Sequence, residues 1–165
     1  MPTDKKTIDS YNKNAKKWAH AKRDGSSIFH TYLEKPAMYN KLPNVKDKTV
    51  LCIGCGSGEE VNYIHSLGAK RIVGIDIAEG LIAIAEKSYA DFEFHVMDME
   101  KLEIPPESFD FAFSSLTMHY LLDWTKALSS LRKVLRKNGI FLFSINHPFF
   151  SAVERCEDEK VKSRI

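Results

Sequence analysis

A short apolar run that breaks into three alternate glycines constrains this chain more than any other feature. Residues 49–53 read Thr-Val-Leu-Cys-Ile, and the seven residues from Cys52 read Cys-Ile-Gly-Cys-Gly-Ser-Gly. Glycine at every second position removes side chains where a chain turns sharply and something packs against its backbone. The pattern predicts a strand, a ligand-binding turn and a helix, because open parallel sheets bind ligands beyond the carboxyl ends of their strands.

The same stretch also holds two cysteines, Cys52 and Cys55, at C-x-x-C spacing. A structural zinc site needs four ligands, commonly as two close pairs, and the only other cysteine is Cys156. A redox dithiol would normally stand at the start of a helix, whereas Cys52 falls inside the predicted strand. We therefore interpret both residues as small buried apolar side chains. The histidines show no metal-ligand pair spacing either, so no metal site is predicted.

Further apolar runs alternate with helical patterns along the chain. Strands are expected at residues 71–75, 92–96, 109–115 and 140–145, and helices at 59–67, 79–88 and 123–137, the last begun by Asp123 and stopped by Asn138-Gly139. Short buried strands that alternate with helices indicate βαβ units joined by right-handed crossovers. The expected fold is α/β, a doubly wound, mainly parallel Rossmann-like sheet.

The region before the first strand is predicted to be helical. Residues 7–23 carry an apolar stripe that includes Tyr11 and Trp18, and a shorter helix starts near Pro36. We divide this single domain into an N-terminal helical lid (1–45), a cofactor-binding α/β core (46–150) and a charged C-terminal tail (151–165).

Composition excludes several classes of function. The 24 Lys and Arg residues nearly balance the 22 Asp and Glu residues, for a net charge of +2, so no nucleic-acid partner is expected. The basic run from Lys13 to Arg23 is interpreted as the solvated face of the first helix. No apolar run approaches the ~20 residues of a membrane span, and three cysteines make no secreted disulfide framework. We expect a cytoplasmic protein that has no membrane partner.

Acidic residues follow the second and third predicted strands. Asp76 stands at the end of Gly74-Ile75-Asp76-Ile77, where it can accept hydrogen bonds from two ribose hydroxyls. Asp98 follows the third strand and can accept a bond from an exocyclic adenine amine, with Ile77 and Met99 as apolar neighbours of the ring. The spacing G-x-G-x-G differs from the G-x-G-x-x-G of dinucleotide folds, which disfavours a nicotinamide cofactor.

As an ordered set, these motifs resemble those of the class I S-adenosylmethionine-dependent methyltransferases, especially the small-molecule group like the ubiquinone/menaquinone-biosynthesis enzymes. The resemblance covers about residues 8–150 and includes Ser114 to Tyr120 and Leu131 to Phe143. It implies S-adenosylmethionine as the cofactor and a sheet of order 3-2-1-4-5. It implies a set of cofactor-binding residues: Gly54, Cys55, Gly56, Gly58, Asp76, Ile77, Asp98, Met99, Ser115, Tyr11 and Trp18, the last two from a lid helix.

Two departures from the family pattern bear on function. The family usually has Asp or Glu where this chain has Cys52, and that acid helps to hold the ammonium of the cofactor's methionine. The family's strands six and seven also have no counterpart here, so the chain is either a fragment or a reduced sheet. An uncovered fifth strand would template pairing with another chain, which predicts a homo-oligomer through that edge.

The expected activity is transfer of a methyl group to a small-molecule acceptor by direct in-line displacement, largely through positioning. If the acceptor must lose a proton, His119 is the candidate general base and His147 the second choice. Phe149, Phe150 and Tyr32, with Tyr11 and Trp18, are candidates for lining an acceptor pocket. Two rival functions stay open: a catalytically silent cofactor-binding module, suggested by Cys52, and an NAD-dependent oxidoreductase, suggested by the glycine loop alone.

Overall fold

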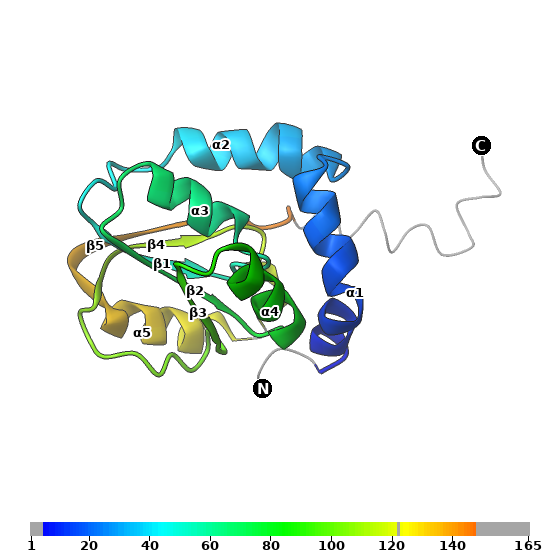
Figure 1. Cartoon of the computed structure of the whole chain (residues 1–165). Coiled ribbons are helices and arrows are strands. Elements are labelled where there is room, and N and C mark those ends of the chain that lie inside the picture. The colour runs from blue at the N-terminus through cyan, green and yellow to red at the C-terminus, as the bar shows by residue number, and fades with distance from the viewer. Residues whose placement is uncertain (1–4, 122, 148–165) are drawn as a thin grey trace, which may run out of the picture.

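The structure is a computed structural model, and it describes residues 5–121 and 123–147. A central sheet with helices on both faces fills the molecule, and the N-terminal helix α1 (Lys5–Arg23) stands across one end of it (Figure 1). Within the described residues, no helix is long and apolar enough to cross a membrane. The expected tail at 151–165 and the candidate pocket residues Phe149 and Phe150 lie outside the described residues.

The sheet has the predicted parallel topology. Its strands are β1 (Thr49–Ile53), β2 (Arg71–Asp76), β3 (Glu93–Val96), β4 (Phe109–Ser114) and β5 (Leu135–Phe143), in the order β3-β2-β1-β4-β5. Register places Cys52 opposite Gly74 of β2 and Phe113 of β4. The fold class and the strand order are therefore confirmed.

Alternation along β1 sends side chains to two separate cores. Val50 and Cys52 join the core under α3 (Glu59–Ser66) and α4 (Glu79–Ser88), while Leu51 and Ile53 join the core under α5 (Trp124–Val134). Both faces of a parallel sheet are buried in this way, so its strands read as near-continuous apolar runs. The result is a three-layer sandwich in which all the βα turns open toward one edge of the sheet.

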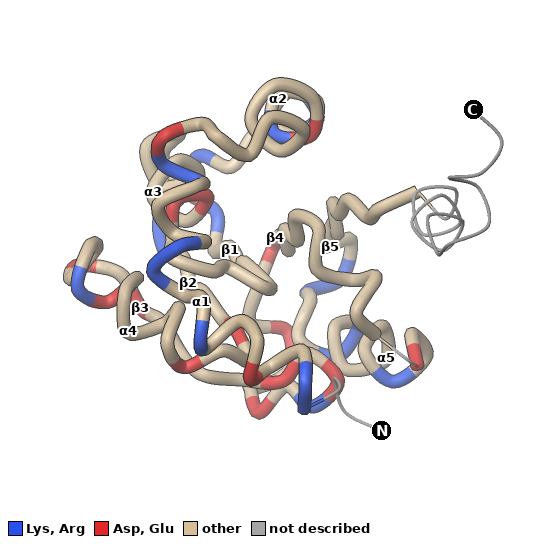
Figure 2. The backbone as a smooth tube through the Cα atoms, turned by 90° about the vertical axis from the view of Figure 1, so that its right-hand side faces the viewer, with Lys and Arg blue, Asp and Glu red and all other residues tan. Residues whose placement is uncertain are grey.

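The N-terminal region packs outside these layers. Helix α1 lies against α4, where Ala15 meets Ala78 and Leu81. A π-helical turn, η1 (His30–Glu34), leads directly into α2 (Lys35–Asn40), whose Tyr39 ring stacks on Tyr63 of α3 at 3.7 Å. Figure 2 shows α2 beside α3 and shows basic and acidic residues interspersed over the helices.

The end of α5 differs from the prediction. The helix begins after Asp123, whose carboxylate accepts from Thr125 N as expected of an N-cap, but it ends at Val134 instead of at Asn138-Gly139. Ser108 N and Glu107 N donate to the carbonyls of Val134 and Lys133, at 2.8 and 2.9 Å, and so occupy groups that a longer helix would use. Asn138 instead lies within β5, where its φ is +65° in the segment in which the register to β4 shifts.

Candidate active site

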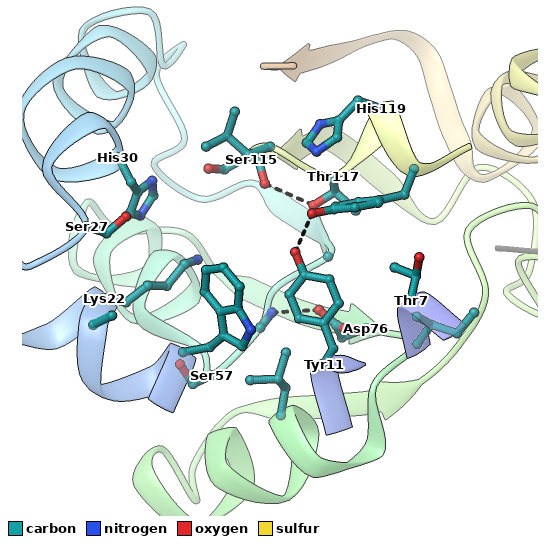
Figure 3. Close-up of a pocket in the computed structure, with 18 of the residues that line it drawn as sticks. Thr7, Tyr11, Lys22, Ser27, His30, Ser57, Asp76, Ser115, Thr117 and His119 are labelled. Atoms are coloured by element: carbon teal, nitrogen blue, oxygen red, sulfur yellow. Dashed lines mark hydrogen bonds between the residues drawn. The ribbon is translucent and has the colours of Figure 1, made fainter. Parts of the chain in front are cut away.

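A cavity of about 260 Å³ opens at the carboxyl ends of β1, β2 and β4. Helix α1 closes one side of it, and the turns that follow the three strands form the other (Figure 3). The lining residues are Thr7, Tyr11, Trp18, Ala21, Lys22, Ser27, His30, Gly54, Gly56, Ser57, Asp76, Ile77, Leu81, Met99, Ser115, Leu116, Thr117, His119, Tyr120 and Asn146. Segments far apart in the sequence therefore meet where the sequence predicted a ligand.

The glycine loop keeps its backbone open to this cavity. Gly54 has a φ of +65°, and a Cβ at that position would collide with Thr117, so only glycine fits between β1 and the turn after β4. Gly58 has a φ of +92° as the N-cap of α3, and a Cβ there would stand 2.9 Å from Tyr89. Gly54 and Gly56 line the cavity, whereas Gly58 and Cys55 pack away from it.

Asp76 ties the loop to the next helix. Its Oδ2 accepts from Gly56 N at 2.9 Å, and its Oδ1 accepts from Ala78 N at 2.9 Å. Burial raises the pKa of this carboxyl, against the backbone hydrogen bonds that lower it. Because each carboxylate oxygen has two lone pairs, Asp76 can hold the loop and still accept from a ligand in the cavity.

A second, smaller cavity of about 30 Å³ adjoins the first. The two share Gly54, Asp76, Ile77, Met99 and Thr117, and the smaller one adds Ile53, Ile75, Met97 and Asp98. The Oδ1 atom of Asp98 accepts from Glu100 N at 2.9 Å, which leaves Oδ2 for another donor. These apolar side chains and the Asp98 carboxylate can contact one edge of a flat heterocycle that extends from the larger cavity and bears an amine.

Two aromatic side chains of α1 cover the cavity. Tyr11 OH lies 2.5 Å from the hydroxyl of Tyr120, which belongs to the short 3-10 turn η2 (Met118–Tyr120). Burial, together with this hydrogen bond, raises the pKa of Tyr11 well above its usual range. The Trp18 ring packs against Tyr11 at 5.5 Å. The hydroxyl pair, drawn as a dashed line from Tyr11 in Figure 3, thus links α1 to the turn after β4.

The segment after β4 supplies polar groups to the opposite wall. Thr117 Oγ1 donates to the Ser115 carbonyl at 2.9 Å, and Ser115 Oγ donates to Glu34 Oε1 at 2.9 Å. The His119 Nε2 atom is 3.4 Å from Asn146 Nδ2, while its Nδ1 atom is buried without a hydrogen-bond partner among the described residues. Burial lowers the pKa of His119, so its imidazole is neutral near pH 7.

Charged side chains form a buried network beside the lid. Lys22 Nζ lies 3.1 Å from both carboxylate oxygens of Glu60, and His30 places Nε2 3.3 Å from Glu60 Oε1 and Nδ1 2.9 Å from Glu34 Oε2. Glu34 Oε1 also accepts a hydrogen bond from Ser144 Oγ. The network joins α1, η1 and α3 to the ends of β4 and β5.

The network sets the charge states of its members. Hydrogen bonds to Glu34 and Glu60 raise the pKa of His30. Burial alone would raise the pKa of Glu60, but the charge of Lys22 and the contact with His30 hold it well below its usual range. Burial likewise opposes the charge of Lys22, yet Glu60 raises its pKa. The two carboxylates therefore stay ionised and are balanced by two cations when His30 is protonated.

Cys52 does not reach this site. Its side chain is 1% exposed and lies in the core under α3, and burial raises the pKa of the thiol, which stays neutral. Cys55 is likewise buried and neutral. No metal-binding cluster of three or more His, Cys, Asp or Glu residues occurs within residues 5–121 and 123–147.

Most residues singled out from the sequence meet in this region. Tyr11, Trp18, Gly54, Gly56, Asp76, Ile77, Met99, Ser115 and His119 line the larger cavity, and Asp98 lines the smaller one. Tyr32 does not line the cavity and is 73% exposed. Sequence reasoning missed Lys22, His30, Thr117 and Asn146. For Thr117 and Asn146 a signal existed, since each follows a predicted strand of the sheet.

Comparison with known proteins matches this chain to one family. The methyltransferase domain family matches residues 51–143. An uncharacterized protein of Haemophilus influenzae is 35% identical over 144 residues, which is 81% of this chain and 57% of that protein. A malonyl-[acyl-carrier protein] O-methyltransferase of Yersinia pestis is 35% identical over 95 residues, which is 58% of this chain and 35% of that enzyme. The chain thus spans about half the length, or less, of these relatives.

A solved structure shares both fold and sequence. An S-adenosylmethionine-dependent methyltransferase from Mesorhizobium loti superposes with a TM-score of 0.67 at 34% identity, over 71% of this chain and 54% of that protein.

Proposed function

We propose that this chain, which belongs to the S-adenosylmethionine-dependent methyltransferases, transfers a methyl group from S-adenosylmethionine to a small-molecule acceptor bound under the lid formed by α1. One observation carries the proposal. Gly54, Gly56, Asp76 and Met99, predicted separately from three strand ends, line one cavity, and Asp98 lines the cavity that adjoins it.

The residues present fit this cofactor. Asp98, Ile77 and Met99 all line the smaller cavity, and together they offer a carboxylate for the amine and apolar surface for the ring of adenine. Asp76 stands where the two cavities join and is the natural acceptor for ribose hydroxyls. The open backbone of Gly54 and Gly56 then leaves room for the methionine end in the larger cavity.

When bound, S-adenosylmethionine supplies an electrophilic methyl group on a sulfonium that departs as a neutral thioether. The work left to this chain is to hold the acceptor in line and to exclude water, an effect worth up to ~7–11 kcal/mol in model systems. Tyr11 and Trp18 exclude water from above, and Ser115, Thr117 and His119 face the cavity from the turn after β4. These side chains form the wall against which an acceptor would be held.

His119 is proposed to contact the acceptor as a neutral imidazole. A protonated ring would need a partner at the buried Nδ1 atom, where none is found among the described residues, so burial disfavours the imidazolium. If the acceptor must lose a proton, we propose His119 as the general base. A His119→Ala variant that keeps both the parent rate and its pH profile would remove His119 from the reaction.

The acceptor is proposed to be small. Malonyl-[acyl-carrier protein] O-methyltransferases are among the relatives, which makes carboxylates carried on a thioester the first acceptors to screen. Purified protein would be incubated with candidate acceptors, and formation of S-adenosylhomocysteine would be measured. Product formation with one class of acceptor is the expected result. S-adenosylmethionine that binds without turnover of any acceptor would favour the silent binding module that the neutral Cys52 suggests.

Calorimetry distinguishes the proposed methyltransferase from the remaining rival function, an NAD-dependent oxidoreductase. S-adenosylhomocysteine should bind, and NAD should give no heat. Binding of NAD with no response to either sulfur nucleotide would overturn the proposed function in favour of an oxidoreductase.

The proposed oligomer edge is β5. Ile140 is 52% exposed and Phe143 38% exposed on this last strand of the sheet, so apolar side chains accompany its unpaired backbone groups within the described residues. We propose self-association through this edge.

A further inference from the structure

Lys22 places a cation in the cavity above the glycine loop. Among the described residues that line the cavity, it is the only lysine or arginine. Its Nζ atom lies 3.8 Å from the point where a Cβ on Gly56 would stand. The basic run of α1 was expected to face solvent, but this side chain is only 24% exposed and turns inward (Figure 3). Burying a cation costs free energy unless the charge is paired, so the position of Lys22 depends on a partner.

Glu60 fixes the ammonium in this position. Both Glu60 oxygens lie 3.1 Å from Lys22 Nζ, and the Glu60 side chain is only 4% exposed in the first turn of α3. Glu60 is itself held by His30 and does not line the cavity. The two bonds to Glu60 use two of the three N–H donors of the ammonium, so one donor is left for a group in the cavity.

We propose that Lys22, positioned by Glu60, binds the carboxylate at the amino-acid end of the cofactor. The inference rests on the proposed function, since it needs an adenosyl amino acid over the loop. A carboxylate is the anionic group of that ligand, and Lys22 is the cation next to the part of the loop that has no side chains. Cys52 is buried and neutral, so this chain does not hold the amino-acid end through an acid at that position. Recognition passes to the carboxylate instead.

A purely structural role for Lys22 predicts a different pattern of ligand affinities. As a clasp between α1 and α3, Lys22 would stabilise the closed lid over any ligand, with or without a carboxylate. The two roles separate when two ligands are compared that share the adenosyl thioether. S-adenosylhomocysteine carries the amino-acid end, whereas 5′-methylthioadenosine lacks it.

The test measures both dissociation constants by calorimetry for the parent and for Lys22→Met, Lys22→Arg, Glu60→Gln and Lys16→Met. Lys22→Met should raise the dissociation constant of S-adenosylhomocysteine by about tenfold or more, as expected for a lost bond between charged groups. It should change the dissociation constant of 5′-methylthioadenosine by less than about twofold. Lys22→Arg should restore most of the selectivity. Glu60→Gln should lose part of it, because the ammonium is less well held. Lys16→Met changes an exposed lysine of the same helix and should match the parent.

Three results would overturn the proposal. Equal losses for the two ligands in Lys22→Met would assign Lys22 to the clasp alone. Unchanged binding of both would show that Lys22 touches neither. If Lys22→Met fails to fold, as judged by its melting curve, a Glu60→Gln variant that keeps the full selectivity of the parent decides against the proposal. A parent that binds neither ligand overturns the proposed function as well, whereas a parent that binds both without help from Lys22 overturns only this inference.

Discussion

Asp76 is the residue whose replacement tests the site most directly. We expect Asp76→Asn to weaken binding of S-adenosylhomocysteine by tenfold or more, and more than Asp98→Asn does. Asp76 stands where the two cavities meet, whereas Asp98 borders only the smaller one. Asp76 is placed to accept from two ribose hydroxyls, while Asp98 is expected to accept from one amine and shares the adenine with apolar neighbours.

The magnitude follows from the bonds that are lost. Hydrogen bonds to a charged acceptor are worth about 1.5–3 kcal/mol each. Burial opposes ionisation of Asp76, as its raised pKa shows, so the lower end applies. One bond of about 1.5 kcal/mol already corresponds to roughly tenfold in the dissociation constant.

The same substitution also affects folding, and the assay must separate the two effects. Asp76 accepts from Gly56 N and Ala78 N, and an asparagine can keep only one of these bonds through its carbonyl oxygen. A buried N–H left without a partner costs about 1–3 kcal/mol. Melting temperatures without ligand therefore accompany the calorimetry. Asp76→Ala, which strands both N–H groups, should lower the melting temperature more than Asp76→Asn does.

Two results would assign Asp76 a different role. If Asp76→Asn folds and binds S-adenosylhomocysteine with the parent's affinity, Asp76 serves only to tie the loop to α4. If Asp98→Asn loses more affinity than Asp76→Asn, the two carboxylates have been assigned to the wrong parts of the ligand.

Three further predictions concern the lid, the buried network and the edge. Tyr11→Phe and Tyr120→Phe each remove the hydrogen bond between the two hydroxyls, which lie 2.5 Å apart and whose bond is worth about 0.5–1.5 kcal/mol. Each variant should weaken the binding of S-adenosylhomocysteine by a few fold. Fully additive effects in the double variant would contradict a direct interaction between the two side chains. The pKa of His30 is raised in the fold, so its stabilising contribution is complete below about pH 6.5 and is lost as the pH rises through the folded pKa. The melting temperature of the parent should therefore fall in that pH window, whereas that of His30→Gln should not. Parallel plots of melting temperature against pH for the two proteins would refute the assignment. Ile140→Lys should reduce self-association in sedimentation velocity, and a parent that is monomeric at all concentrations would exclude the β5 edge.

The fold could be predicted because local signals and tertiary needs agree. The central strands β1, β2 and β4 are short, mostly apolar runs that are largely buried, and α5 begins directly after its predicted start signal, Asp123. The predicted C-terminal end of α5 was wrong. Asn138-Gly139 is a good local stop, but the loop before β4 takes the carbonyls of Lys133 and Val134 first. That competition arises between segments far apart in the chain, which no local pattern reports.

The residues of the candidate site also fall into a group that local sequence patterns predict and a group that they do not. Residues at strand ends were predictable, because the topology of a parallel sheet brings its carboxyl ends together. Lys22, His30 and Glu60 were not, because each looks like an ordinary surface residue in its own segment. Their burial depends on how α1 and η1 close over the first turn of α3, and a charge run on a helix is consistent with either a solvated or a buried side chain until that packing is known.

The buried network also explains how this site can tolerate a cysteine at position 52. An acid there would add a third carboxylate to Glu34 and Glu60 of the network, close to Glu60, whose charge already raises the pKa of the Cys52 thiol. With Glu60 ionised and held by Lys22 and His30, like-charge repulsion would raise the pKa of a third acid and loosen the pairing. A neutral, small Cys52 avoids that repulsion. Restoring the acid through Cys52→Asp should therefore lower the melting temperature, and it should do so less in a Glu60→Gln background, where one competing charge is absent. Equal losses in the two backgrounds would show that the cysteine and the network are independent.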